Sequence, residues 1–158
     1  MQTAQVNYDA RRARADDIGA LTELVEKYWR FEGIAGFDAA RIGAQLRRLV
    51  SDERLGACWI AEKGGAPVGY LLAVYVFSLE HFGMTAEIDE FFIRPDARGK
   101  GLGSRLLKTA EETFTTERLL KCLPATGPDQ RFGSPVLSPP RLHIPFRLRT
   151  FRKRFGTR

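Results

Sequence analysis

The chain has few residues of the kinds that form covalent or metal cross-links. Its 158 residues include two cysteines and two histidines. Cys58 and Cys122 make no disulfide framework, and no metal-ligand spacing of cysteine, histidine or carboxylate residues occurs. Cys58 falls in a predicted strand, where we expect a small core residue. The sequence therefore predicts neither a disulfide scaffold nor a metal site.

Long apolar segments are also missing. No apolar run approaches ~18 residues, so we expect no transmembrane helix and no membrane partner. The N-terminus is polar and lacks the apolar core of a secretory signal, which favours a cytoplasmic location. With 44% hydrophobic residues, the chain is long enough for one globular domain with its own core.

The net charge of +6 is unevenly distributed along the chain. Residues 118–158 hold ten of the 25 basic residues and one of the 19 acidic residues, so residues 1–117 carry a net charge of −3. An argument for nucleic-acid binding from the overall charge cannot be applied to the acidic part. For the folded region we expect no nucleic-acid partner.

Hydrophobic periodicity predicts an α/β arrangement over the first 117 residues. The expected elements are a strand at 6–13, a helix from about 18 to 30, a helix after Asp38, strands at 57–62, 68–77 and 86–93, and a helix after 101. Asp16 or Asp17 is the expected N-cap of the first helix, and Asp38 that of the second. Residues 63–67 have the composition of a hairpin turn, and 78–85 are expected to form a loop.

The most informative stretch runs from 86 to 114. A strand carrying carboxylates is followed by a turn, a glycine-rich loop and a helix whose apolar face is Leu102, Leu106, Ala110 and Phe114. A helix N-terminus offers unpaired N–H groups and a partial positive charge, which suit a phosphate group. Glycines allow the backbone to approach a ligand closely. The sequence predicts a phosphate-binding loop at 98–104.

The glycine register decides which phosphate loop this is. The dinucleotide fingerprint needs glycine at its sixth position, and the sixth position from Gly99 is Ser104. A P-loop needs Gly-Lys-Ser/Thr, which is absent here. The Arg-x-x-Gly-x-Gly pattern from Arg98 to Gly103, after a strand ending in Phe-Phe-Ile, resembles the acetyl-CoA-binding segment of the GNAT superfamily of N-acetyltransferases. The resemblance covers residues 6–117.

The resemblance implies a GNAT-like α/β fold, with a mixed, mostly antiparallel central sheet flanked by helices. It also implies an N-acetyltransferase that transfers an acetyl group from acetyl-CoA, as co-substrate, to an amine. Backbone amides of the central strand would hold the pantetheine arm, and those of the loop would hold the pyrophosphate. These residues are Phe91, Phe92 and Ile93 in the strand, and Arg98, Gly99, Lys100, Gly101, Leu102, Gly103 and Ser104 in the loop.

The carboxylates of the central strand are the candidate catalytic groups. Strand alternation predicts Glu87 and Asp89 on one face, ~6.5–7 Å apart. Two close carboxylates beside a low-dielectric cleft can raise one another's pKa into the range useful to a base. By the resemblance, Glu87 aligns with the base of histone-type members, while Asp89 and Glu90 align with acidic positions of polyamine-type members.

We therefore predict Glu87 or Asp89 as the base, and Tyr28, Asp89 and Glu90 as substrate-binding residues. The acidic run favours a small cationic amine. In the alternative interpretation, Glu87 and Asp89 are solvated charges or partners of Arg11, Arg12 or Arg14. The sequence identifies neither the amine acceptor nor a general acid.

The expected pattern stops after Glu117. Six of the eight prolines lie between 124 and 145, and arginines gather from 147 to 158. Residues 118–158 are either a natural basic extension or the product of a slipped reading frame, and we favour the slip because core elements are due there. A second hypothesis is a non-catalytic acyl-CoA-binding module whose basic tail contacts nucleic acid or an acidic partner. Many relatives dimerise through their last strands, so a homodimer also stays open.

Overall fold

The computed structural model describes residues 7–117, 119 and 122–124. The strands are β1 (Tyr8–Arg12), β2 (Gly56–Lys63), β3 (Ala66–Ser78), β4 (Gly83–Ile93) and β5 (Cys122–Pro124). The α-helices are α1 (Ile18–Glu32), α2 (Ala39–Ser51) and α3 (Leu102–Thr116), and short 3-10 turns lie at Ala15–Asp17 and Pro95–Ala97. Within these ranges, no helix has the length and apolar character needed to cross a membrane.

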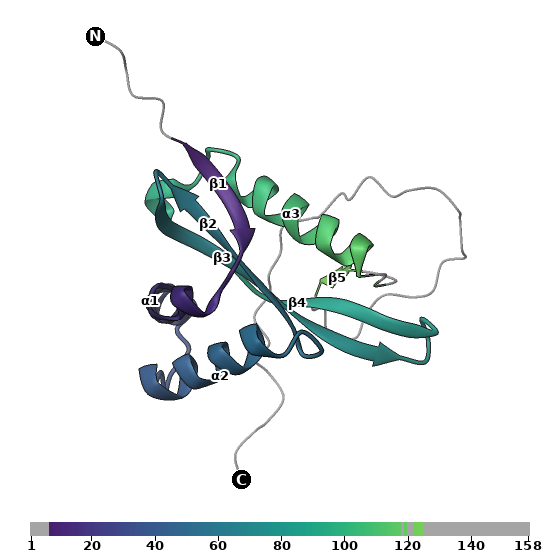
Figure 1. Ribbon diagram of the computed structural model, residues 1–158. Coiled ribbons are helices and arrows are strands. Elements are labelled where there is room, and N and C mark those ends of the chain that lie inside the picture. The colour runs from purple at the N-terminus through teal and green to yellow at the C-terminus, as the bar shows by residue number, and fades with distance from the viewer. Residues whose placement is uncertain (1–6, 118, 120–121, 125–158) are drawn as a thin grey trace. The chain divides into compact units, whose positions relative to one another are not determined.

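The strands form one sheet in the order β1-β2-β3-β4-β5 (Figure 1). The first four strands are antiparallel to their neighbours, and β5 runs parallel to β4. Gly64 and Gly65 connect β2 to β3 with φ angles of 58° and 80°, the left-handed conformation of a tight hairpin turn. The predicted α/β arrangement with a mixed, mostly antiparallel sheet is confirmed.

Helices cover both faces of the sheet. The predicted apolar face of α3 is buried against Trp59 and Leu71. On the opposite face, α1 and α2 pack through Leu21, Leu24 and Leu46 against Ile60 and Tyr70. Burial of this apolar surface from both sides is the main stabilising contribution, at roughly 25 cal/mol per Å².

The helix starts were predicted with mixed success. The Asp38 carboxylate accepts the backbone N–H of Arg41 at 3.0 Å, as an N-cap does, so that prediction is confirmed. Asp17 does occupy the N-cap position of α1, but its side chain makes no capping bond there. Its carboxylate instead binds the Arg11 guanidinium at 2.8 Å and accepts the N–H of Arg14.

The loop predicted at 78–85 is wrong over half of its length. Met84 and Thr85 already pair with Phe77 and Val76, so only 79–82 connect the two strands. The β3–β4 hairpin extends beyond the body of the sheet (Figure 1). Phe77 and Met84 are exposed there, and glycine, at position 83, is uncommon in strands, so the sequence showed no apolar strand pattern at this end of β4.

A β-bulge interrupts β4 at Asp89. Leu72 of β3 lies opposite Glu90, while the next residue, Ala73, lies opposite Ile88, so Asp89 has no partner. The extra residue shifts the alternation of side chains by one position. Ile88 and Phe91 both pack toward α3, so strict alternation fails beyond Asp89. Glu87, opposite Val74, and Asp89, which faces α2, lie on the other face, so the prediction that these two acids share a face agrees with the structure.

β5 is a strand that the sequence pattern did not indicate. Its three residues pair in parallel with Ala86, Glu87 and Ile88. Such a short strand has no period of its own to detect, and it forms by pairing with β4. The predictions for the remainder of 118–158, including the irregular basic tail and the slipped reading frame, lie outside the described residues.

Candidate active site

One edge of β4 is open beyond the bulge. The N–H of Arg94 donates to the carbonyl of Val68 in β3 at 2.8 Å. Backbone groups point to alternate sides along a strand, so the N–H of Phe92 also faces β3, and those of Phe91 and Ile93 face the opposite edge. In the ranges that the structure covers, β5 pairs only with 86–88 and leaves this edge without a strand partner. Of the three predicted strand amides, those of Phe91 and Ile93 are therefore free to donate hydrogen bonds to an extended ligand.

The glycine-rich loop that follows has the conformation of an anion site. Gly99 and Gly101 both have φ of 74°, in the left-handed region that favours glycine. The first intrahelical bond of α3 runs from the N–H of Arg105 to the carbonyl of Gly101. The N–H groups of Leu102, Gly103 and Ser104 therefore have no intrahelical acceptor, and no side chain of the described part caps them.

Arg98 fixes this loop between β4 and α1. Its Nε donates to the carbonyl of Ile93 at 2.9 Å, and its guanidinium carbon lies 5.1 Å from the ring centroid of Phe31. Arg94 forms an ion pair with Asp96 at 2.8 Å, so the negative charge of Asp96 is balanced within the turn before the loop. A long ligand that ends in phosphates fits this surface. The strand edge would bind its extended part, and the free helix amides with Arg98 and Lys100 would bind its phosphates.

Glu90 is the most strongly held carboxylate of the central strand. The indole Nε1 of Trp29 donates to one of its oxygens at 3.0 Å, and the hydroxyl of Tyr70 donates to the other at 2.8 Å. Burial raises the pKa of Glu90, the charge of Asp89 raises it further, and the two hydrogen bonds oppose that rise. Glu90 is therefore a carboxyl group whose proton affinity is increased by its surroundings.

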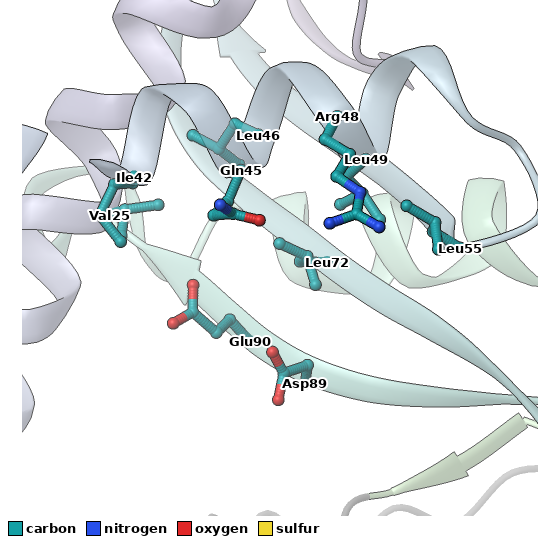
Figure 2. A pocket seen from close by; sticks show the side chains of 10 residues that line it. All are labelled: Val25, Ile42, Gln45, Leu46, Arg48, Leu49, Leu55, Leu72, Asp89 and Glu90. Atoms are coloured by element: carbon teal, nitrogen blue, oxygen red, sulfur yellow. The ribbon is translucent and has the colours of Figure 1, made fainter. Parts of the chain in front are cut away.

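A cavity of about 260 Å³ lies between α2 and the strands β3 and β4 (Figure 2). Its walls are mostly apolar, with two carboxylates on the β4 side. The lining residues are Val25, Ile42, Gln45, Leu46, Arg48, Leu49, Leu55, Leu72, Asp89 and Glu90. Successive strand residues normally point to opposite faces, and the bulge at Asp89 is the reason that both acids line one cavity.

The predicted site residues Glu87 and Tyr28 do not line this cavity. Tyr28 packs behind Glu90, with its ring centroid 6.4 Å from that of Tyr70 and 5.9 Å from that of Phe92. Burial, together with the charges of Glu90, Glu32 and Asp89, raises the pKa of Tyr28 to about 12.

Three polar side chains of the site were not predicted from the sequence. Trp29 donates a hydrogen bond to Glu90, which the sequence gives no sign of. Gln45 and Arg48 line the cavity from α2. They flank the apolar residues Ile42, Leu46 and Leu49 at helical spacing, which is the signal that could have placed them on the sheet-facing side.

The alternative in which the strand acids pair with nearby arginines is not supported for two of the three arginines. Arg11 binds Asp17 and Glu62 at 2.8 and 2.7 Å. Arg12 binds Glu117 at 2.8 Å and lies 3.7 Å from Glu53. Their hydrogen bonds tie β1 to the ends of other elements, so these two cations stabilise the fold and leave the acids of β4 free of them.

Comparison with known proteins identifies the family. The model of the acetyltransferase (GNAT) family matches residues 19–131. An uncharacterized N-acetyltransferase from Archaeoglobus fulgidus is 30% identical over 112 residues, which are 70% of this chain and 75% of the relative. A thialysine N-epsilon-acetyltransferase from Sus scrofa is 23% identical over 112 residues, 65% of this chain and 64% of the relative. The chain belongs to the GNAT family of acetyl-CoA-dependent acyltransferases.

Solved structures have the same fold. An integron cassette protein from the mobile metagenome of Cole Harbour Salt Marsh has a TM-score of 0.72 and 27% identity, covering 84% of this chain and 92% of that one. A predicted acetyltransferase from Clostridium acetobutylicum, solved with acetyl-CoA, has a TM-score of 0.65 and 16% identity, covering 77% and 82%. These matches confirm the predicted GNAT-like fold.

Proposed function

We propose that this protein transfers an acetyl group from acetyl-CoA to a small primary amine bound in the cavity beside β4. The observation that carries the proposal is the pair Asp89 and Glu90, two adjacent carboxylates that line one apolar cavity. Neither makes an ion pair with any of the described residues. Glu90 is partly buried and Asp89 is exposed beside it. An unpaired carboxylate that is partly removed from water favours a cationic ligand, because its charge then needs a partner.

The open edge of β4 and the start of α3 are the proposed binding surface for acetyl-CoA. The N–H groups of Phe91 and Ile93 would bind the pantetheine arm, and those of the loop and the first turn of α3 would bind the pyrophosphate. Arg98 and Lys100 add positive charge to this end. When bound, acetyl-CoA supplies a thioester, an acyl group activated for transfer to an amine.

The strand acids have two tasks in this proposal. They first attract the acceptor as an ammonium ion, which must then lose a proton before its nitrogen can act as a nucleophile. Asp89 is the candidate base among the two originally predicted, because it lines the cavity and Glu87 does not. Glu90, held by Trp29 and Tyr70, anchors the amine, and its increased proton affinity makes it a second acceptor for the proton.

The size of the cavity and one relative support a small acceptor. About 260 Å³ is close to the lower end of the range for small-molecule pockets. The Sus scrofa relative is a thialysine N-epsilon-acetyltransferase, whose name describes a small acceptor. Both observations favour a free small amine over a folded protein as the acceptor.

Release of the CoA thiol from acetyl-CoA in the presence of a panel of primary amines tests this function. The proposal expects thiol release that depends on the amine and a product that carries one added acetyl group by mass spectrometry. Calorimetry with CoA, done in parallel, measures cofactor binding by itself. Tight CoA binding without turnover of any amine would contradict the enzymatic proposal and favour the non-catalytic acyl-CoA-binding module.

A further inference from the structure

The two walls of the cavity carry opposite charges. Asp89 and Glu90 lie on β4, and Arg48 reaches into the cavity from α2, beside the amide of Gln45 (Figure 2). The apolar side chain of Leu72 lies between the arginine and the carboxylates in this view. A ligand that lies across the cavity therefore meets a negative wall, an apolar centre and a positive wall in that order.

The Arg48 guanidinium is available for a ligand. It makes no ion pair or side-chain hydrogen bond with the residues in the covered ranges. Asp52, one turn further along the chain, is engaged by Arg54, whose Nε and Nη2 donate to its two carboxylate oxygens at 2.8 and 2.9 Å. Arg48 and the two strand acids also stay more than salt-bridge distance apart, so the opposite charges do not neutralise one another across the cavity.

We infer that the preferred acceptor is an amino carboxylate, with a primary amine and a carboxylate joined by a short aliphatic chain. The inference rests on the proposed function and names the substrate class of that same cavity. The ammonium group would lie at Asp89 and Glu90, the chain against Leu46, Leu49 and Leu72, and the carboxylate at Arg48. A guanidinium presents paired N–H donors that match a carboxylate.

This arrangement also disfavours the polycationic acceptors that the acidic run by itself suggests. A diamine of the same length would place its second ammonium group beside Arg48, where like charges repel. Selection by such an unfavourable pairing is a common source of specificity. The acids of β4 define where the reacting amine binds, and Arg48 defines which amines fit the opposite end.

Three acceptors of similar length separate these effects: ε-aminohexanoate, hexylamine and hexamethylenediamine. The full-length protein and two variants, Arg48→Gln and Arg47→Gln, are compared by kcat/KM for each acceptor. Arg47 is the matched control, because it is exposed on the same helix, has the same charge and does not line the cavity. Binding of ε-aminohexanoate is measured in parallel by calorimetry.

The wild-type protein is expected to prefer ε-aminohexanoate to hexamethylenediamine. Arg48→Gln should lower kcat/KM for the amino carboxylate by roughly five- to tenfold. It should leave kcat/KM for hexylamine unchanged and raise kcat/KM for the diamine. Arg47→Gln should change none of the three. An equal loss for all three acceptors in Arg48→Gln, or the same loss of ε-aminohexanoate activity in Arg47→Gln, would overturn the inference.

Failure of the proposed function gives a different result. If no amine is acetylated while ε-aminohexanoate still binds in an Arg48-dependent way, the binding inference stands and the acetyltransferase proposal is wrong. If hexylamine is acetylated and Arg48→Gln leaves ε-aminohexanoate turnover and binding unchanged, the acetyltransferase proposal stands and the inference is wrong.

Discussion

The indole Nε1 of Trp29 lies 3.0 Å from one carboxylate oxygen of Glu90, and these residues come from α1 and β4. The Tyr70 hydroxyl occupies the other oxygen at 2.8 Å. Both donors are neutral, so they orient the carboxylate without cancelling its charge. A cation in this position would have made Glu90 a structural ion pair. The neutral donors instead leave a negative charge on the wall of the cavity.

Replacing Trp29 tests whether this orientation affects chemistry. The Trp29 bond lowers the pKa of Glu90, so Trp29→Phe should raise that pKa and move the acid limb of the pH profile of kcat/KM to higher pH. Activity well above that limb should fall by less than about threefold, because the ring stays apolar. Tyr28→Phe is the control, since Tyr28 packs nearby but no hydrogen bond of its hydroxyl to Glu90 is present. If kcat/KM of Trp29→Phe falls by the same factor at every pH, Trp29 contributes packing and does not tune the pKa of Glu90.

Glu90 itself should make stability depend on pH. Burial raises its pKa, so the folded protein binds this proton more tightly than the unfolded chain does. The free energy of unfolding therefore falls as pH rises from the ordinary carboxyl range through the raised value. Glu90→Gln has no proton to lose, so its urea midpoint relative to wild type should be higher at about pH 8 than at about pH 4.

The exposed Glu23→Gln provides a control for the loss of one negative charge. If the urea midpoint of Glu90→Gln relative to that of wild type falls with rising pH, the sign of the Glu90 effect is wrong. A pH-independent difference would mean that burial of Glu90 does not raise its pKa.

The sequence predicted what local patterns determine. Leu102, Leu106, Ala110 and Phe114 recur at helical spacing and are all buried, because one face of α3 must cover the sheet. Gly99 and Gly101 mark the loop since few other residues adopt its left-handed backbone. These signals lie within a few residues of one another, so periodicity and turn chemistry reveal them.

Other features depend on contacts between distant segments. Whether β4 contains an extra residue at Asp89 is decided by its register with β3, and strict alternation cannot show it. β5 exists only as a partner of Ala86–Ile88. The bond between Trp29 and Glu90 joins two elements that the sequence separates widely. The composition of the site was thus predictable in part, but the grouping of its acids was not.

The cavity distinguishes the two candidate bases that the sequence could not tell apart. Asp89 lines the cavity, while Glu87 lies opposite Val74 and outside it. Asp89→Asn should lower kcat about a hundredfold, within the range for loss of a general base, and Glu87→Gln should lower it less than about threefold. CoA affinity, measured by calorimetry, should be unchanged in both variants. A loss of kcat in Glu87→Gln that exceeds the loss in Asp89→Asn would mean that Glu87 is the base, as the alignment with histone-type members implies.

The cofactor loop can be tested by a pair of substitutions that differ only in charge. Gly101 has φ of 74° and precedes the free N–H groups of α3, and a Cβ built there meets no atom within 4 Å. Asparagine tolerates this backbone conformation better than most residues and aspartate has the same shape, so the comparison separates strain from charge. Gly101→Asp should weaken CoA binding more than about tenfold, because its carboxylate would repel the pyrophosphate, while Gly101→Asn should weaken it by about threefold or less. The two affinities are measured by calorimetry at low salt, where the difference should be largest, and at high salt, where screening should reduce it. Equal losses in both variants at both salt concentrations would show that the loop does not bind the charged end of CoA.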